Sequence, residues 1–374
     1  MAASGGSLPG DDALAAVVRT SQGDYRVLVD RGLVEVLGDE VRATGLEGRA
    51  FIVADEAVYP VPVRRAQESM ERAGFETHVL TLPSGEPTKN LDKIKDIYGW
   101  LLRLRAERRD VVLAMGGGVM GDAAGFAAAT YRRGVALVQV PTTLAAMVDA
   151  SLGGKVAVNL PEAKNMVGAF HQPKLVLSDV DFLDTLPRRE MAAGWAEAIK
   201  HGLIMDPDLL ETFETQADDL LDLRGEGAVE VIRRSVAIKA GVVSADEFET
   251  GDTRVLLNYG HTIGHALETV SAYGEFLHGE AVSVGMMGAA AISESLGLIG
   301  TELVDRQRAV LQRFGLPVSA PGHAADAVFE ATKSDKKSAG GAIRWVLLEG
   351  PGATTTRSDV PDELVRDVIG ALVE

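Results

Sequence analysis

The sequence predicts an α/β protein whose N-terminal domain carries a mostly parallel, Rossmann-like sheet and whose C-terminal domain is mainly α-helical. In the first half of the chain, short β-branched runs alternate with amphipathic helical patterns, as in parallel βαβ units. One of these runs leads directly into a glycine-rich turn. After about residue 181 the apolar residues recur almost only at helical spacing. These three observations together define the fold class.

An α/β domain is expected at residues 16–181, after a small, Gly-rich flexible tail at residues 1–15 that lacks the basic and apolar regions of a signal peptide. Amphipathic spacing predicts helices at Val63–Ala73 and Asn90–Glu107. Runs rich in Val, Ile and Leu predict strands at Tyr25–Val29, Phe51–Ala54, Thr77–Leu82, Val111–Met115, Ala136–Val140 and Leu175–Leu177.

A mainly helical domain is predicted at residues 182–374. Phe182–Pro187 would join the two domains, with Pro187 opening the first long helix. A late strand is predicted at Ile343–Leu348. The predicted helices are Arg188–Leu203, Leu209–Asp222, Ala228–Ser244, His261–Val270, Glu280–Leu296 and Thr301–Phe314.

The composition excludes several functional classes. The chain has 54 acidic and 37 basic residues, a net charge of −17, which argues against binding to nucleic acid or an anionic membrane. The longest apolar runs are too short to span a bilayer, so a cytoplasmic protein is expected. With no cysteine, disulfides and thiolate chemistry are impossible, and any transition-metal site must use histidine and carboxylate ligands.

The glycine-rich turn Gly116–Asp122 has the G-x-G-x-x-G spacing between a predicted strand and a predicted helix. Such a turn brings backbone amides close to a pyrophosphate. The acidic residue usually found about 20 residues later is absent, and Asp55, at the end of an earlier strand, is a substitute. The alternative is a tight turn that binds nothing.

Three of the seven histidines, His261, His265 and His278, lie within 18 residues. The first two share one face of a helix with Glu268. Two histidines and one carboxylate would leave a catalytic metal one open position. The spacing leaves Glu197, Glu268 and Glu280 open as the carboxylate. Histidines satisfied in the core or at helix caps are the alternative.

Several cations stand beside Gly, Asn or Thr rather than in solvated runs. If they converge, they form a local positive site for a phosphorylated or carboxylated substrate. Each of them alone could equally form a surface ion pair. They are Arg133, Lys155, Lys164, Lys200 and Arg254.

Ten segments, taken together, resemble the 3-dehydroquinate synthase family of the sugar-phosphate cyclase superfamily, and the resemblance runs from about Tyr25 to about Leu348. The segments are Pro83–Lys89, Gly116–Asp122, Tyr131–Gly134, Gln139–Thr143, Asp149–Lys155, Lys164–Phe170, Ala196–Lys200, Leu257–His265, Leu277–Glu280 and Asp335–Lys337.

The resemblance implies Zn²⁺ or Co²⁺ held by Glu197, His261 and His278. It implies an NAD site formed by Asp55, Glu86, Lys89, Gly117, Gly118, Val119, Asp122, Thr142, Thr143, Asp149, Lys164, Phe182, Thr185, Leu186 and Glu190. It implies substrate contacts, shared with Asp149, from Lys155, Asn165, Lys200, Lys239, Arg254, Asn258, His265 and one of Lys336 or Lys337. Arg133 would reach the phosphate site of a neighbouring subunit in a homodimer.

The activity that the resemblance implies is conversion of a heptulosonate phosphate to 3-dehydroquinate and phosphate, with no net redox change. A sedoheptulose 7-phosphate cyclase, a metal-dependent polyol dehydrogenase and a non-catalytic nucleotide-binding protein are the alternatives. Two departures from the family pattern are Ala57, where a polar residue is common, and a segment Glu249–Arg254 that is one residue longer.

Overall fold

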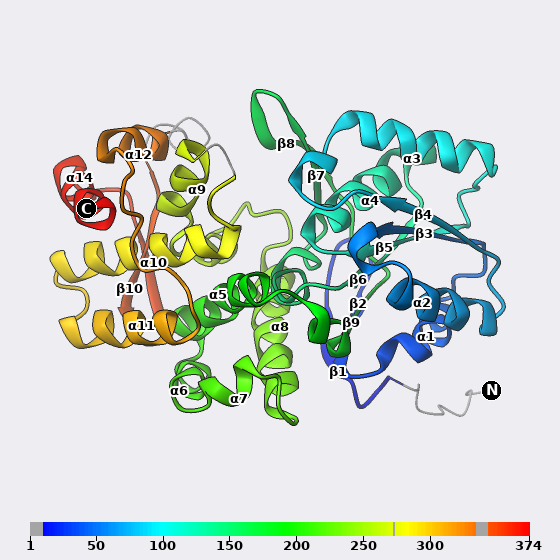
Figure 1. Cartoon of the computed structure of the whole chain (residues 1–374), viewed down its shortest axis with the longest axis horizontal. Coiled ribbons are helices and arrows are strands. Elements are labelled where there is room, and N and C mark those ends of the chain that lie inside the picture. The colour runs from blue at the N-terminus through cyan, green and yellow to red at the C-terminus, as the bar shows by residue number, and fades with distance from the viewer. Residues whose placement is uncertain (1–9, 272–273, 334–342) are drawn as a thin grey trace. The chain divides into compact units, whose positions relative to one another are not determined.

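The computed structural model describes residues 10–271, 274–333 and 343–374 (Figure 1). These residues form two compact units, and each is described separately. The first unit takes the chain up to Leu186 together with Lys239–Phe248, and the second takes Pro187–Ile238 together with Glu249–Glu374. The first unit thus includes a segment, Lys239–Phe248, that lies outside the range 16–181 predicted for the first domain.

The first unit is built on a seven-stranded sheet with the order β1-β2-β9-β6-β5-β3-β4. Only β1 is antiparallel to its neighbour, and the other pairs are parallel. The predicted mostly parallel sheet is therefore confirmed. Its strands are β1 (Leu14–Val18), β2 (Tyr25–Asp30), β3 (Ala50–Asp55), β4 (Thr77–Leu82), β5 (Val111–Gly116), β6 (Ala136–Pro141) and β9 (Leu175–Asp179).

Three strands of this unit are not predicted from the sequence. Strand β1 pairs with β2 at the edge of the sheet, and its first two residues overlap the predicted tail. Strands β7 (Lys155–Leu160) and β8 (Ala163–Phe170) form a separate antiparallel hairpin. This hairpin carries several of the predicted site residues.

Helices cover both faces of the sheet. Figure 1 shows α1 (Leu37–Ala43) and α2 (Val61–Arg72) on one face, and α3 (Leu91–Arg103) and α4 (Gly118–Thr130) on the other. On the α3 and α4 side, alternate residues of β3 and β5 such as Phe51 and Val112 pack against Ile97 in one buried cluster. The β-branched strands and amphipathic helices thus bury one shared core.

The second unit is mainly helical, as predicted, with one hairpin of β10 (Trp345–Gly350) and β11 (Ala353–Arg357). The predicted helix Leu209–Asp222 is two helices that meet at Gln216. The helices that begin in this unit are α5 (Arg188–Met205), α6 (Pro207–Thr215), α7 (Ala217–Leu221), α8 (Gly227–Ala245), α9 (His261–Val270), α10 (His278–Ser295), α11 (Thr301–Arg313), α12 (Ala325–Thr332) and α14 (Asp362–Val373).

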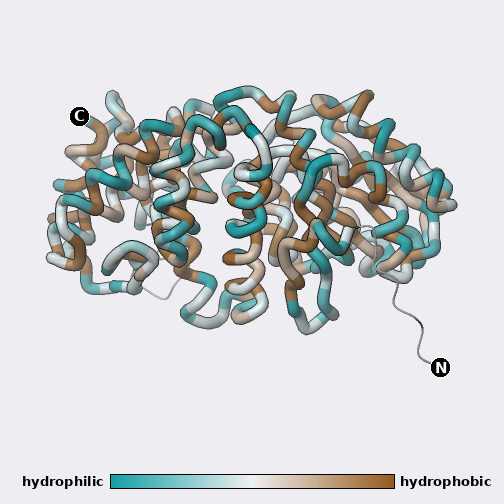
Figure 2. The backbone as a smooth tube through the Cα atoms, turned by 90° about the horizontal axis from the view of Figure 1, so that it is seen from below, coloured by the Kyte–Doolittle hydropathy of each residue, from teal (hydrophilic) through white to brown (hydrophobic). Residues whose placement is uncertain are grey.

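Helix α10 is the centre of the second unit. It is buried continuously from Ala281 to Ala290 and packs against α5, α9, α11, α14 and β10. Outer helices alternate between hydrophobic and hydrophilic residues along the chain (Figure 2), as helices with one face toward a core do. Among the described residues, no helix combines the length and apolar character needed to cross a membrane.

Candidate metal and nucleotide sites

The glycine-rich turn of the first unit lies between β5 and α4. Strand β5 is buried along its whole length, and no described side chain caps the first turn of α4. A Cβ atom at Gly116 would lie 2.7 Å from Cβ of Met120, and one at Gly117 would lie 3.1 Å from Cγ2 of Thr143. Glycine is therefore required for this close packing. The resulting helix N-terminus is suited to a phosphate group.

Two further predicted nucleotide residues lie at the carboxyl ends of β6 and β3, the two strands that flank β5 in the sheet. The amide of Thr142, after β6, donates to the carbonyl of Gly116 at 2.9 Å. Asp55 ends β3, and its Oδ1 accepts hydrogen bonds from the amide of Ala57, at 2.9 Å, and from the Ser84 hydroxyl. The carboxyl ends of parallel strands are where doubly wound sheets bind ligands.

A charged network brings five predicted residues together. Lys89 is only 5% exposed, forms an ion pair with Asp122, and donates from Nζ to Oδ1 of Asn165 at 2.5 Å. Nζ of Lys164 lies 3.4 Å from Oε1 of Glu86. Burial raises the pKa of Asp122 to about 6, and Lys89 opposes this change. The network joins residues predicted for NAD to one predicted for substrate.

A second contact of the first unit joins two predicted residues that are far apart in sequence. Nζ of Lys239 donates to the backbone oxygen of Asp149 at 2.7 Å and forms an ion pair with its carboxylate. Lys155 is exposed at the start of β7. Arg133 is also exposed, and its φ of +64° follows a φ of +50° at Arg132. Two successive non-glycine residues with positive φ are unusual.

The remaining predicted nucleotide residues lie on short helical segments. Val119 is in the first turn of α4. Phe182 is buried in the 3₁₀ segment Val180–Thr185, and Thr185 donates to its carbonyl at 3.3 Å. Leu186 follows this segment, and Glu190 lies on α5 in the second unit, where burial raises its pKa. These contacts show where the five residues lie, and their assignment to NAD stays a prediction.

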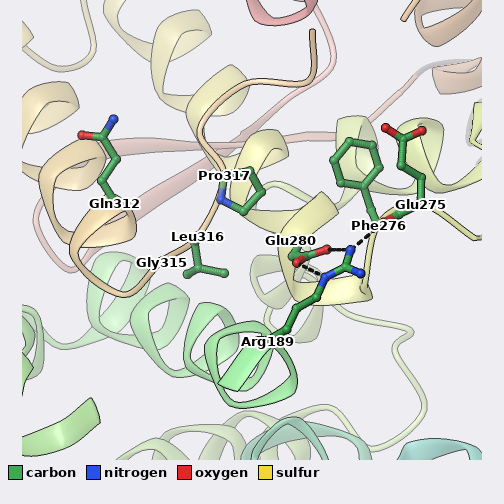
Figure 3. A pocket seen from close by; sticks show the side chains of 8 residues that line it. All are labelled: Arg189, Glu275, Phe276, Glu280, Gln312, Gly315, Leu316 and Pro317. Carbon is green, nitrogen blue, oxygen red and sulfur yellow. Dashed lines mark hydrogen bonds and ion pairs between the residues drawn. The ribbon is translucent and has the colours of Figure 1, made fainter. Parts of the chain in front are cut away.

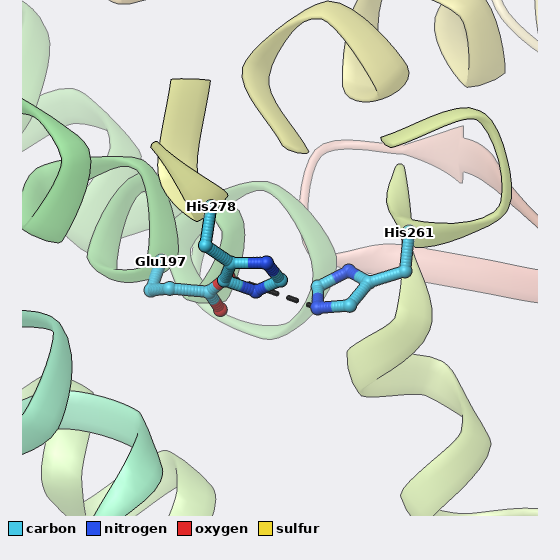
Figure 4. Close-up of side chains that lie close together, drawn as sticks. All are labelled: Glu197, His261 and His278. Atoms are coloured by element: carbon cyan, nitrogen blue, oxygen red, sulfur yellow. Dashed lines mark ion pairs between the residues drawn. The ribbon is translucent and has the colours of Figure 1, made fainter. Parts of the chain in front are cut away.

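The second unit holds a compact group of one carboxylate and two imidazoles (Figure 4). Glu197 comes from the middle of α5, His261 from the first residue of α9 and His278 from the first residue of α10. Nε2 of His261 and Nε2 of His278 lie 3.7 and 3.5 Å from Oε1 of Glu197. One ligand atom from each residue lies within 4.8 Å of the others.

This group fits a tetrahedral metal ion. Two ligand atoms bound to zinc at about 2.1 Å are separated by about 3.4 Å, close to the distances observed here. Oε1 of Glu197 is buried and has no hydrogen-bond partner among the described residues, while its other oxygen is ion-paired with Lys200. The side chain of His278 keeps 43% exposure. A cation would therefore satisfy the buried oxygen and remain accessible on one side.

The electrostatics of this group also favour a cation. Burial alone would raise the pKa of Glu197, but Lys200 and the two histidines hold it well below its usual range. Burial lowers the pKa of His278, but Glu197 and Glu268 outweigh this and raise it to about 10. Burial and Lys200 keep the pKa of His261 well below its ordinary value. Positive charge is thus favoured at His278, between two carboxylates.

The structure separates the three carboxylates that spacing leaves open. Glu197 groups with His261 and His278, and Glu268 groups with His265 and the same His278. Oε2 of Glu268 lies 3.4 Å from Nδ1 of His278, on the opposite side of the ring from Nε2. Burial, together with His278, lowers the pKa of His265 to about 4. Glu280 belongs to neither group.

Glu280 instead holds the start of α10. Its carboxylate accepts two hydrogen bonds from Arg189 and one from the amide of Leu277, at 2.7, 2.7 and 2.8 Å. Figure 3 shows this ion pair in a cavity of about 660 Å³, lined also by Glu275, Phe276, Gln312, Gly315, Leu316 and Pro317. Of the three carboxylates that the spacing leaves open, Glu280 lines this cavity, where it bonds Arg189 and the amide of Leu277 and so anchors the turn before His278.

Two glycines let α10 approach the other ligand-bearing helices. A Cβ atom at Gly279 would lie 1.9 Å from the carbonyl oxygen of Ala193 on α5. A Cβ atom at Gly285 would lie 1.9 Å from the carbonyl oxygen of Gly260, the residue before α9. Nothing in the sequence pattern indicates this role, although Gly279 stands inside the segment Leu277–Glu280.

Four other residues predicted to contact the substrate are Arg254, Asn258, Lys336 and Lys337. Arg254 is buried at the start of the 3₁₀ segment Arg254–Asn258, and Nδ2 of Asn258 donates to Oε1 of Glu249 at 3.5 Å. Lys336 and Lys337 lie outside the described residues. One residue that the sequence analysis did not select, Asn159, contacts both Glu86 and Asn165.

Comparisons with known proteins agree on one family. The models for the N-terminal and C-terminal parts of 3-dehydroquinate synthase match residues 79–193 and 194–338. A 3-dehydroquinate synthase from Nostoc punctiforme is 42% identical over 355 residues, covering 94% of this chain and 98% of that protein. Both halves of the chain are therefore matched.

Two solved structures share the fold. The 2-epi-5-epi-valiolone synthase ValA from Streptomyces hygroscopicus, with NAD⁺ and Zn²⁺ bound, has a TM-score of 0.85 and 29% identity, covering 93% of this chain and 96% of that one. A 2-deoxy-scyllo-inosose synthase complexed with carbaglucose-6-phosphate, NAD⁺ and Co²⁺ has a TM-score of 0.83 and 28% identity, covering 96% and 99%. Both neighbours hold a nicotinamide cofactor and a divalent metal.

Proposed function

The chain belongs to the 3-dehydroquinate synthase family, and we propose that it converts 3-deoxy-D-arabino-heptulosonate 7-phosphate into 3-dehydroquinate and inorganic phosphate. The observation that carries the proposal is the group of Glu197, His261 and His278, with its buried, unsatisfied carboxylate oxygen. It occurs in a chain that also keeps the glycine-rich turn. Similar enzymes bind NAD⁺ with Zn²⁺ or Co²⁺.

In this proposal, Glu197, His261 and His278 hold Zn²⁺ or Co²⁺. When bound, NAD would take up and return a hydride, and the metal ion would polarise the oxygens at the reacting carbons. The residues proposed to hold NAD are Asp55, Glu86, Lys89, Gly117, Gly118, Val119, Asp122, Thr142, Thr143, Asp149, Lys164, Phe182, Thr185, Leu186 and Glu190.

The chain's own residues would mainly bind and orient the substrate. The sugar loses phosphate by β-elimination and closes its ring by an intramolecular aldol reaction, so its two anionic groups must be held in place. Lys155, His265 and Arg133 would orient the phosphate, and such positioning removes several kcal/mol of barrier. Further contacts would come from Asn165, Lys200, Lys239, Arg254, Asn258 and one of Lys336 or Lys337.

The proposal extends to assembly and location. We propose a homodimer in which Arg133 serves the phosphate site of the neighbouring subunit, and a cytoplasmic enzyme that acts on a small anionic sugar phosphate rather than on nucleic acid. The exposure of Arg133 supports this role, since a residue that serves another subunit must be accessible from outside its own chain. The net charge of −17 supports the exclusion of nucleic acid.

The test is to incubate the protein with NAD⁺, Zn²⁺ and the heptulosonate phosphate. Phosphate and 3-dehydroquinate should be released in equal amounts, with no accumulation of NADH absorbance. A His278→Ala variant should keep its fold by circular dichroism but lose bound zinc and product formation. Full zinc occupancy in that variant would contradict the ligand assignment.

The same assay separates the alternatives. Turnover of sedoheptulose 7-phosphate in place of the heptulosonate would identify a related cyclase. Stoichiometric NADH formed from a polyol would identify a dehydrogenase.

A further inference from the structure

Asn159, the fifth residue of β7, contacts two segments that carry proposed ligand residues, Glu86–Lys89 and the start of β8. Its Nδ2 donates to Oε1 of Glu86 at 2.7 Å, and its Oδ1 accepts from the backbone amide of Asn165 at 3.1 Å. Its own backbone amide donates to the carbonyl of Lys89 at 2.8 Å. One side chain and one amide thus connect the segment Glu86–Lys89 to the first residues of β8.

This connection meets an unusual backbone conformation at Asn165 and a shared carboxylate oxygen at Glu86. Asn165 has a φ of +57°, a left-handed conformation that costs most residues free energy and that asparagine tolerates better than most. The hydrogen bond to Asn159 helps to hold the Asn165 backbone in this conformation. In the segment Glu86–Lys89, Oε1 of Glu86 accepts the hydrogen bond from Nδ2 of Asn159, and the same oxygen also faces Nζ of Lys164.

Only an amide matches both neighbours at once. The carboxylate of Glu86 needs a donor and the N–H of Asn165 needs an acceptor. The amide of Asn159 must therefore turn Nδ2 toward Glu86 and Oδ1 toward Asn165. An aspartate would keep the acceptor but would place a carboxylate against Glu86. A leucine would remove both hydrogen bonds at nearly the same side-chain volume.

We propose that Asn159 is a positioning residue that couples the nucleotide and substrate sites of the first unit. Ordering of Glu86 and Lys89 by NAD would, through Asn159, also order Asn165 against the substrate. The direct hydrogen bond from Lys89 to Asn165 reinforces the same connection. This inference rests on the proposed function, which assigns Glu86 and Lys89 to NAD and Asn165 to the substrate.

The test is a double-mutant cycle on the zinc-loaded protein, with NAD⁺ affinity measured by fluorescence titration and kcat and KM measured for the sugar phosphate. Asn159→Asp should weaken NAD⁺ binding about 10-fold, because it replaces a charge-assisted hydrogen bond with repulsion. In a Glu86→Gln background the same change should cost less than about 2-fold, since the amide introduced at position 86 can donate to the new carboxylate. Equal losses in both backgrounds would overturn the contact.

Coupling is read from Asn159→Leu, which should weaken NAD⁺ binding and raise the KM for the sugar phosphate together, each about 10-fold. The control is Met166→Ala, which changes a 73% exposed side chain next to Asn165 on β8 and should alter neither. The coupling would be overturned if the wild type turns over normally but Asn159→Leu changes only the NAD⁺ affinity, only the KM for the sugar phosphate, or neither. A wild-type protein without cyclase turnover would instead overturn the proposed function, and this inference with it.

Discussion

Substituting Gly279 by alanine should separate α10 from α5 next to a proposed metal ligand. The new Cβ atom would lie 1.9 Å from the carbonyl oxygen of Ala193, about 1 Å short of the 3.0 Å below which real Cβ contacts essentially never occur. His278 precedes Gly279 and would move with α10. Its Nε2 is now 3.5 Å from Oε1 of Glu197, so a 1 Å shift would bring the two atoms to about 4.5 Å.

That separation is too large for one zinc ion. With bonds of about 2.1 Å, two ligand atoms can be at most about 4.2 Å apart even on opposite sides of the ion. We therefore expect zinc affinity to fall about 100-fold or more. Removing a residue that only hydrogen-bonds to a metal ligand already lowers metal affinity about 10–100-fold. Overpacking should also lower the free energy of unfolding by about 1–3 kcal/mol.

The assay is zinc competition with a chromophoric chelator, combined with denaturant unfolding of the metal-free protein. The matched control is Gly370→Ala, which places the same methyl group in open space within α14 and should raise stability by about 0.5–1 kcal/mol. If Gly279→Ala binds zinc as the wild type does and its stability changes like that of Gly370→Ala, the packing argument is refuted.

Three further changes test other parts of the site. Glu268→Gln should weaken zinc binding about 10–100-fold, because Glu268 orients His278 through Nδ1; an unchanged affinity in the chelator assay would show that it does not. Lys155→Ala should lower kcat about 100-fold but leave NAD⁺ affinity nearly unchanged, and equal losses in both would count against a role in orienting phosphate. Burial raises the pKa of Asp122 from 3.8 to about 6, so the folded protein binds this proton more tightly than the unfolded chain does, and stability falls as pH rises. Relative to Asp122→Asn, the wild type should therefore lose about 1.4 kcal/mol of unfolding free energy between pH 5 and pH 7.5, and a constant difference in denaturant titrations would contradict this.

The sheet of the first unit could be predicted where the local pattern agrees with the tertiary structure. Val111–Met115 is an apolar run followed directly by glycines, and it forms the fully buried strand β5. Strand β1 was missed because Leu14–Val18 is short and contains two alanines, which have little strand propensity. It forms because it pairs with β2, a long-range contact that no local pattern contains.

The candidate metal group likewise depends on long-range contacts that no local pattern contains. The four-residue spacing of His261 and His265 predicted a shared helix face, but spacing alone left three carboxylates open. What brings Glu197 to this face is the close approach of α5 and α10 at Gly279. Asn159 was missed because a single polar residue in an alternating strand has no distinctive signal until its two partners are seen.

The proposed metal ligands are widely spaced along the chain, with Glu197 lying 64 positions before His261 and 81 before His278. An ion held by all three would act as a reversible cross-link that closes long loops of the second unit, and such links restrict the unfolded chain most when the loops are long. Its binding free energy would add to that of folding. The supply of metal would then control how long the helical unit survives heat or proteolysis, and not only how fast the enzyme turns over.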